Sequence, residues 1–178
     1  MKILVAYETA HGSTVGVAEK IAETLREQGA EVDVARCREL KTLGDYDAFI
    51  IGAPVWGGNW LKPAQEFLRR FGQKLAEHPV AYFHTSGAAG IDDQRETVVR
   101  GMLNVLPKYA PAITPVSVGA FGGVIDFSNY NIAMRLIMKA VVGSQGGPTT
   151  GRHDMRDWEE ISAWTAEVHE AFEEGPAG

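Results

Sequence analysis

Hydroxyl side chains gather in residues 7–14, a loop that follows the first apolar run of the chain and leads directly into a helical pattern. Thr9, Ser13 and Thr14 supply hydroxyls, and the first turn of a helix supplies free N–H groups at its positive dipole end. This combination favours a bound anion, and a phosphate monoester would fit it. The alternative is that Ser13 or Thr14 only caps the helix. His11 either donates a hydrogen bond to the anion or faces solvent.

Two later loops, residues 52–60 and 84–90, are rich in small residues. The first adds two tryptophans to glycines that let the backbone approach a ligand, which suits a planar ring. Trp56 is the better ligand candidate, because Trp60 is expected to pack on the following helix. The amides of the second loop can contact the polar edge of a flat ring, with a plain connector as the alternative.

Several catalytic fingerprints are absent from the sequence. Ser86 has His84 and Ala88 where a hydrolase nucleophile elbow has glycines, and neither a P-loop nor a dinucleotide fingerprint occurs. No histidine spacing is typical of a metal site, so we predict no metal. Asp126, Tyr130 and His84 are the nearest candidates for acid–base chemistry, but nothing ranks them above structural residues, and we predict no catalytic side chain.

The composition sets limits on the class of protein. A chain of 178 residues, 45% hydrophobic and 22% charged, predicts one domain spanning residues 1–178. Its net charge of -6 disfavours a nucleic acid partner. The single cysteine, Cys37, excludes an intrachain disulfide and is expected to be a small residue at a strand end. Without a signal-peptide pattern at the start, we expect a cytoplasmic protein.

The elements that position these loops alternate along the chain, which indicates crossover units on a parallel sheet. The pattern predicts five strands, over residues 2–7, 31–36, 48–52, 80–84 and 116–121. Strict alternation in the second strand places it at an edge of the sheet. Four helices are predicted. The first covers residues 13–28, and the second follows Asn59 as its N-cap, with Pro63 in its first turn. The third begins at Asp92 and Asp93, and the fourth begins near Asp157.

These elements predict an α/β fold with a doubly wound five-stranded parallel sheet. Such sheets bind ligands at the carboxyl ends of their strands, where the strand order reverses. The three loops described above all follow predicted strands, so the fold class gathers them on one edge.

Three small-residue loops after three strands, one rich in hydroxyls and one in aromatics, resemble the flavodoxin family over the whole chain. The resemblance implies the strand order 2-1-3-4-5 and FMN as the cofactor. It implies that the FMN phosphate is held by Thr9, His11, Gly12, Ser13 and Thr14. One wall of the flavin site would comprise Ala53, Pro54, Val55, Trp56 and Gly57, and the other Thr85, Ser86, Gly87 and Gly90. The third loop lacks the aromatic usual in flavodoxins, which leaves one flavin face open to a reactant.

A further C-terminal helix, from Ile132 to Val142, is apolar nearly all round apart from Arg135 and Lys139. A glycine-rich link and an Asp-Trp pair at 157–158 follow it. Together these features are similar to the menaquinone-dependent protoporphyrinogen oxidase branch of the superfamily. The resemblance implies an FMN-dependent oxidoreductase of haem biosynthesis that oxidises protoporphyrinogen IX and passes the electrons to a quinone.

The role of this helix has two interpretations. It can seat near lipid headgroups, giving peripheral contact with the inner face of the membrane, or it can fill the sheet's edge or a contact in a homo-oligomer. The net charge of -6 gives no general attraction to an anionic leaflet. It favours the main alternative function, a flavodoxin-type electron carrier that exchanges electrons with a redox partner protein.

Overall fold

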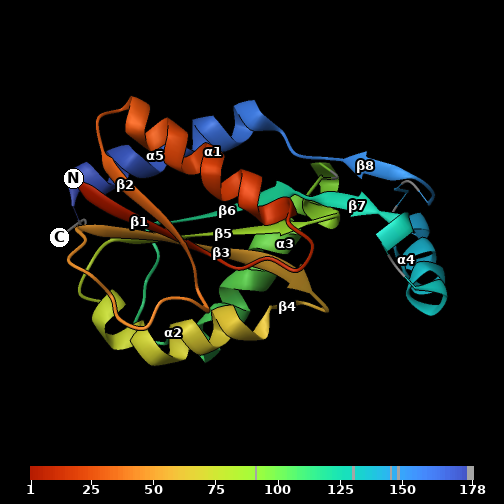
Figure 1. Ribbon diagram of the computed structural model, residues 1–178, viewed down its shortest axis with the longest axis horizontal. Helices are drawn as coiled ribbons and strands as arrows, with labels where there is room; N and C mark the ends of the chain where they lie inside the picture. The colour runs from red at the N-terminus through yellow and green to blue at the C-terminus, as the bar shows by residue number, and fades with distance from the viewer. Residues whose placement is uncertain (91, 130, 145, 148, 176–178) are drawn as a thin grey trace.

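The sheet has the predicted doubly wound topology in the computed structural model, which describes residues 1–90, 92–129, 131–144, 146–147 and 149–175 (Figure 1). Its parallel strands run in the order β2-β1-β3-β5-β6, which confirms the predicted order and the edge position of the second strand. Their bounds are β1 Lys2–Tyr7, β2 Glu31–Arg36, β3 Ala48–Trp56, β5 Val80–Ser86 and β6 Ser117–Gly122. A short strand β4, Asn59–Trp60, pairs antiparallel with β3.

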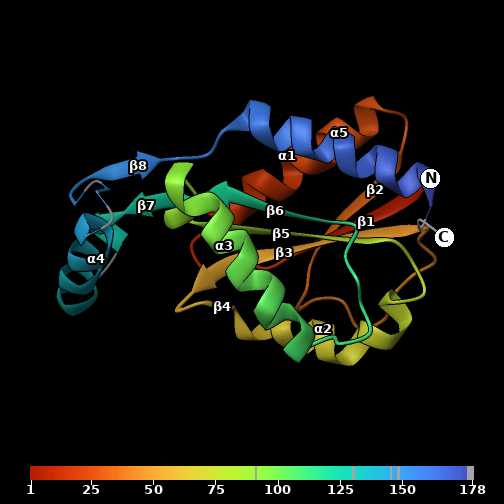
Figure 2. The same ribbon diagram turned by 180° about the vertical axis from the view of Figure 1, so that it is seen from behind.

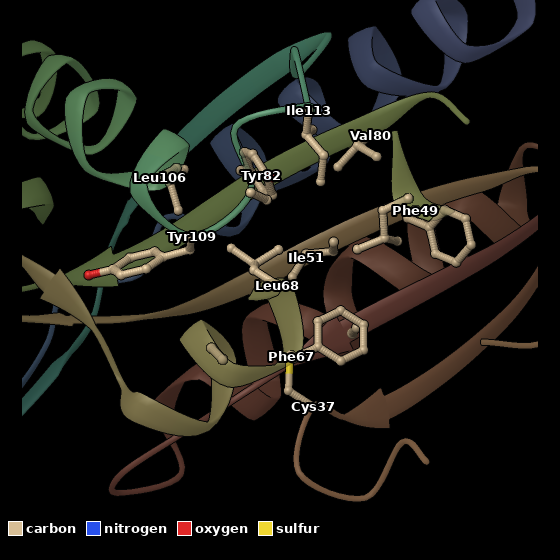
Figure 3. Close-up of a cluster of buried hydrophobic side chains, with 14 of the residues drawn as sticks. Cys37, Phe49, Ile51, Phe67, Leu68, Val80, Tyr82, Leu106, Tyr109 and Ile113 are labelled. Atoms are coloured by element: carbon tan, nitrogen blue, oxygen red, sulfur yellow. The ribbon is translucent and has the colours of Figure 1, made fainter. Parts of the chain in front are cut away.

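Helices cover both faces of this sheet. Helices α1 (Ser13–Glu27) and α5 (Trp158–Glu174) lie on one face, and α2 (Lys62–Leu75) and α3 (Asp92–Val105) lie on the other (Figures 1 and 2). Alternate residues of the buried strands therefore enter two separate cores. On the α2 side, Phe49 and Ile51 of β3 and Tyr82 of β5 pack against Phe67 and Leu68 of α2 (Figure 3).

The start of α2 corrects one prediction. Asn59 does not cap this helix: Leu61 occupies the N-cap position, and the Asn59 Oδ1 accepts a hydrogen bond from the Tyr109 hydroxyl at 2.8 Å. The reason is the turn at Gly57 and Gly58, both with positive φ, which folds residues 59–60 back onto β3 as an antiparallel strand. The last helix, in contrast, begins next to Asp157 as predicted, and the Asp157 side chain caps it by accepting from the amides of residues 159 and 160 at 3.0 Å.

The described residues between 124 and 154 form an appendage at the carboxyl end of the sheet, opposite the N-terminus (Figures 1 and 2). It consists of β7 (Val124–Asp126), α4 (Ile132–Ser144) and β8 (Arg152–Asp154), with β7 and β8 paired antiparallel. A small core of its own joins Ile125, Phe127 and Val142. The apolar helix was predicted, but the hairpin that carries it was not. No described helix is long and apolar enough to cross a membrane.

Candidate functional site

A cavity of about 350 Å³ opens at the carboxyl ends of the strands, where all three predicted loops meet. Of the predicted site residues, it is lined by His11, Ser13, Pro54, Val55, Trp56, Gly57, Thr85, Ser86 and Gly87. Gly12 lines a second cavity beside it. Thr9, Thr14, Ala53 and Gly90 lie behind these walls and line neither cavity.

The loop after β1 is shaped by hydrogen bonds within the protein. Gly12 has φ +89° and occupies the N-cap of α1, which no described side chain caps, so the capping alternative for Ser13 or Thr14 is wrong. The Thr9 hydroxyl accepts from the Gly12 N–H at 2.9 Å. The buried Thr14 hydroxyl lies 3.0 Å from that of Thr85, which ties α1 to β5. Two of the three predicted hydroxyls thus hold the loop in place, while Ser13 faces the cavity.

A buried carboxylate anchors the base of this loop. Glu8 is fully buried, and its oxygens accept hydrogen bonds from Arg36 at 2.9 Å and from Arg38 at 2.7 and 2.9 Å. Burial alone would raise the pKa of Glu8, but the hydrogen bonds from Arg38, the Thr9 amide and Arg36 outweigh it and hold the pKa below its usual value. The sequence did not suggest this cluster, since its members lie about 30 positions apart.

The second loop forms one wall of the cavity. Gly57 and Gly58 adopt left-handed φ values of +55° and +75°, a conformation that side chains rarely adopt. The turn leaves Trp56 beside the cavity, with its ring centroid 6.2 Å from that of His11. Trp60 is buried in the core, as predicted.

The third loop forms the opposite wall. The Ser86 hydroxyl accepts from the Ala89 N–H at 3.0 Å, which tightens the turn. A Cβ on Gly87 would lie 2.8 Å from Cδ1 of Ile125, so glycine lets β7 approach this loop. A Cβ on Gly90 would lie 2.7 Å from the Met155 Cβ. Gly90 therefore serves packing against the segment after β8.

The appendage supplies a wall that the sequence did not predict. Ile125, Met138, Val142 and Met155 face the cavity, together with Val98 of α3. The segment after β8 lies so close to the sheet that a Cβ on Gly122 would be 1.8 Å from the Met155 carbonyl oxygen. The third loop contributes no aromatic to the cavity, whereas the appendage contributes aliphatic and methionine side chains.

The three acid–base candidates have different surroundings. His84 is fully buried, neither ring nitrogen has a partner among the described residues, and burial lowers its pKa to about 4. Asp126 accepts hydrogen bonds from the Ser128 hydroxyl and amide, which hold its pKa below the usual value. Tyr130 lies outside the described residues. In the described part of the chain, no cluster of His, Cys, Asp or Glu could hold a metal ion.

Cys37 is buried beside β1, as expected of a small residue at a strand end. Its pKa is raised, chiefly by burial and further by the nearby Glu8 carboxylate. A thiol that resists ionisation is a poor nucleophile. Cys37 is therefore a packing residue.

A doubly wound parallel sheet, with its cavity formed by the loops that follow β1, β3 and β5, defines a ligand-binding α/β protein of the flavodoxin type. The family model described as a flavodoxin domain matches residues 4–151. The chain therefore belongs to the flavodoxin family, and the predicted cofactor, FMN, is confirmed as that of its family.

Curated relatives and solved structures that are similar to the chain include two dehydrogenases and a flavodoxin. Protoporphyrinogen IX dehydrogenase [quinone] of Escherichia coli is 24% identical over 172 residues, with 94% of each chain covered. An NAD(P)H dehydrogenase (quinone) of Bradyrhizobium is 28% identical over 176 residues, covering 84% of this chain and 82% of the relative. Oxidised Flavodoxin 1 of Bacillus cereus superposes with a TM-score of 0.60 at 18% identity, covering 96% and 98% of the two chains.

Proposed function

We propose that the chain is an FMN-dependent enzyme that oxidises protoporphyrinogen IX and passes the electrons to a quinone. The observation that carries the proposal is the appendage wall of Ile125, Met138, Val142 and Met155, which gives the cavity an apolar side facing the loops proposed to hold the flavin. An electron carrier has no need of room for an apolar substrate beside its cofactor. The similarity to the Escherichia coli relative of that name supports the choice.

The residues at the cavity fit FMN. The N-cap of α1 is a glycine, so the amides of its first turn can face an anion, and nothing lies within 4 Å of a Cβ placed on Gly12. We propose that Ser13 and these amides hold the phosphate. The loop from Pro54 to Gly58 and the loop from Thr85 to Ala88 would contact the two edges of the ring.

FMN, when bound, supplies the two-electron chemistry of the reaction. The protein's part is to orient the reactants, exclude water and handle protons. Trp56 and the appendage wall surround the cavity with apolar atoms, which keeps a hydrophobic ring close to the cofactor. Of the described residues that line this cavity, His11 alone is titratable, and it is exposed at the edge. It is therefore placed to exchange a proton between a bound substrate and solvent.

We further propose that α4 contacts a lipid surface, where a membrane quinone would be reached. Ile132 and Leu136, four residues apart on the same side of α4, are 78% and 65% exposed, and the neighbouring Ile137 is 55% exposed. Arg135 and Lys139 are half-buried next to this stripe, as suits a helix lying among headgroups. Flotation with vesicles tests the contact. A second copy seated on the same stripe would instead give a dimer in light scattering and no flotation.

The second candidate is an electron carrier, which the net charge of -6 favours because such proteins steer toward basic partners. Mixing experiments separate the two. The FMN-loaded protein is incubated without oxygen with protoporphyrinogen IX and a menaquinone analogue, and protoporphyrin fluorescence is followed. A carrier exchanges electrons with a flavodoxin reductase but forms no protoporphyrin. NAD(P)H in place of protoporphyrinogen tests the activity named for the Bradyrhizobium relative.

A further inference from the structure

We propose that a second cavity, beside the first, is an oxyanion subsite in which the Arg152 guanidinium binds a phosphate or carboxylate group. The cavity measures about 270 Å³ and lies between the loop after β1 and the β7–β8 hairpin. It shares His11, Ser13 and Val124 with the larger cavity, so one ligand can extend from one space into the other. The assignment of its ligand rests on the proposed function.

Among the described residues that line this cavity, one guanidinium makes no ion pair with another described residue. Two guanidiniums, those of Arg152 and Arg156, line it together with one carboxylate, that of Asp126. Arg156 is committed to Asp154, to which its Nε and Nη2 donate at 2.8 and 2.5 Å. Asp126 Oδ1 accepts from the Ser128 amide at 2.9 Å and from its hydroxyl at 2.6 Å.

Arg152, in contrast, makes no ion pair with a described carboxylate. No carboxylate oxygen of the described residues lies within ion-pair distance of its guanidinium, although Asp126 is its partner across the hairpin. Its positive charge interacts electrostatically with the carboxylates of Asp126 and Asp154 and helps to lower the pKa of each. The charge of Arg152 therefore remains for a ligand.

The backbone holds Arg152 over the loop after β1. Strands β7 and β8 pair in a hairpin that extends beyond the sheet edge (Figure 2), with Asp126 opposite Arg152. The Phe127 N–H donates to the Gly151 carbonyl at 3.1 Å, and the Met155 N–H donates to that of Gly123 at 3.0 Å. Hydrogen bonds thus flank Arg152 on both sides, which orders the strand that carries its side chain.

Arg156 closes the far side of the cavity. Its Nη1 lies 3.4 Å from the Ser13 carbonyl oxygen, and its guanidinium carbon lies 4.5 Å from the ring centroid of Trp158. Together with the His11 ring and the amides of the first turn of α1, the cavity thus presents donors from three segments. A guanidinium fork suits phosphate and carboxylate groups equally well.

Two ligands of the proposed enzyme carry such a group. One is FMN, through its phosphate, and the other is protoporphyrinogen IX, through its carboxylates. The test compares Arg152→Gln and Arg152→Lys with Lys108→Gln, which removes the same charge from an exposed position beyond α3. Dissociation constants are measured for FMN and riboflavin by flavin fluorescence. Those for protoporphyrin IX and its dimethyl ester are measured by tryptophan quenching on the FMN-loaded protein.

Loss of one charge-assisted hydrogen bond should weaken binding about tenfold in Arg152→Gln, less in Arg152→Lys and not at all in Lys108→Gln. If Arg152→Gln binds FMN more weakly but riboflavin as well as the wild type does, the ligand of Arg152 is the phosphate. If it binds protoporphyrin IX more weakly but the dimethyl ester equally well, the ligand is a carboxylate. Equal affinities in Arg152→Gln and Lys108→Gln for all four ligands would overturn the proposal.

A separate titration distinguishes failure of the subsite from failure of the proposed function. Flavin-free protein is titrated with inorganic phosphate while the amide NMR signals of His11 and Ser13 are followed. Shifts that saturate in the wild type and weaken in Arg152→Gln support the subsite even if neither FMN nor porphyrin binds. Identical titrations in Arg152→Gln and Lys108→Gln count against it, whatever the enzyme assay gives.

Discussion

Lowering the pH from 7.5 to 5 should destabilise the protein through the burial of neutral His84. This side chain is fully buried, both of its ring nitrogens lack a partner among the described residues, and burial lowers its pKa from 6.5 to about 4. The unfolded chain therefore takes up a proton before the folded chain does. The free energy of unfolding therefore has its full value above pH 6.5 and falls as the pH drops toward 4. At pH 5 the linkage relation gives a loss of about 2 kcal/mol.

The assay is urea unfolding followed by circular dichroism at the two pH values. His84→Phe keeps a ring of similar size and removes the titrating group, so its free energy of unfolding should change little between them. His153→Gln is the matched control, and it should lose stability as the wild type does, because His84 is still present. If His84→Phe loses as much stability as the wild type, burial of a neutral His84 is refuted as the cause.

Three further predictions concern other parts of the fold. Glu8 has a lowered pKa, so its ionised form contributes fully to stability above the carboxyl pKa of the unfolded chain, and this contribution is lost as the pH falls through the folded pKa. In urea unfolding below pH about 4.5, the free energy of unfolding of Glu8→Gln should therefore depend less on pH than that of the wild type. Gly122→Ala should lower the free energy of unfolding by about 1–3 kcal/mol in the same assay, since its Cβ would meet the Met155 carbonyl oxygen, whereas Gly101→Ala, with open space around it, should not. Leu136→Glu on α4 should abolish flotation with vesicles and leave the melting temperature unchanged, because the side chain is 65% exposed; flotation equal to the wild type would exclude this face as the contact.

The sequence predicted the parts of the fold that local patterns encode. The apolar run of β1 and the alternating pattern of β2 predicted both strands with their observed bounds, and Asp157 marked the start of α5. Non-local pairings were missed. Each strand of the β7–β8 hairpin has three residues, too few for a pattern, and the two are 25 residues apart. The Asn59 prediction failed because pairing with β3 outweighed a local capping preference.

For the candidate site, too, the sequence predicted some features and missed others. Loop composition indicated Ser13, Trp56 and Gly87 as cavity residues, and all three line the cavity. Thr9 and Thr14 line neither cavity; the Thr9 hydroxyl accepts from the Gly12 amide, and the Thr14 hydroxyl pairs with that of Thr85. Which hydroxyls face a cavity depends on the neighbouring strand, and this cannot be read from a loop alone.

The central proposal, FMN-dependent oxidation of protoporphyrinogen, is tested most directly by one anaerobic titration. Purified protein is mixed with FMN, freed of excess flavin by gel filtration, and followed by its visible flavin absorption as protoporphyrinogen IX and then a menaquinone analogue are added. The proposed function predicts that the flavin band is retained after filtration, bleaches with protoporphyrinogen and returns with the quinone. A band that is lost on filtration, or one that protoporphyrinogen leaves unchanged, would contradict it.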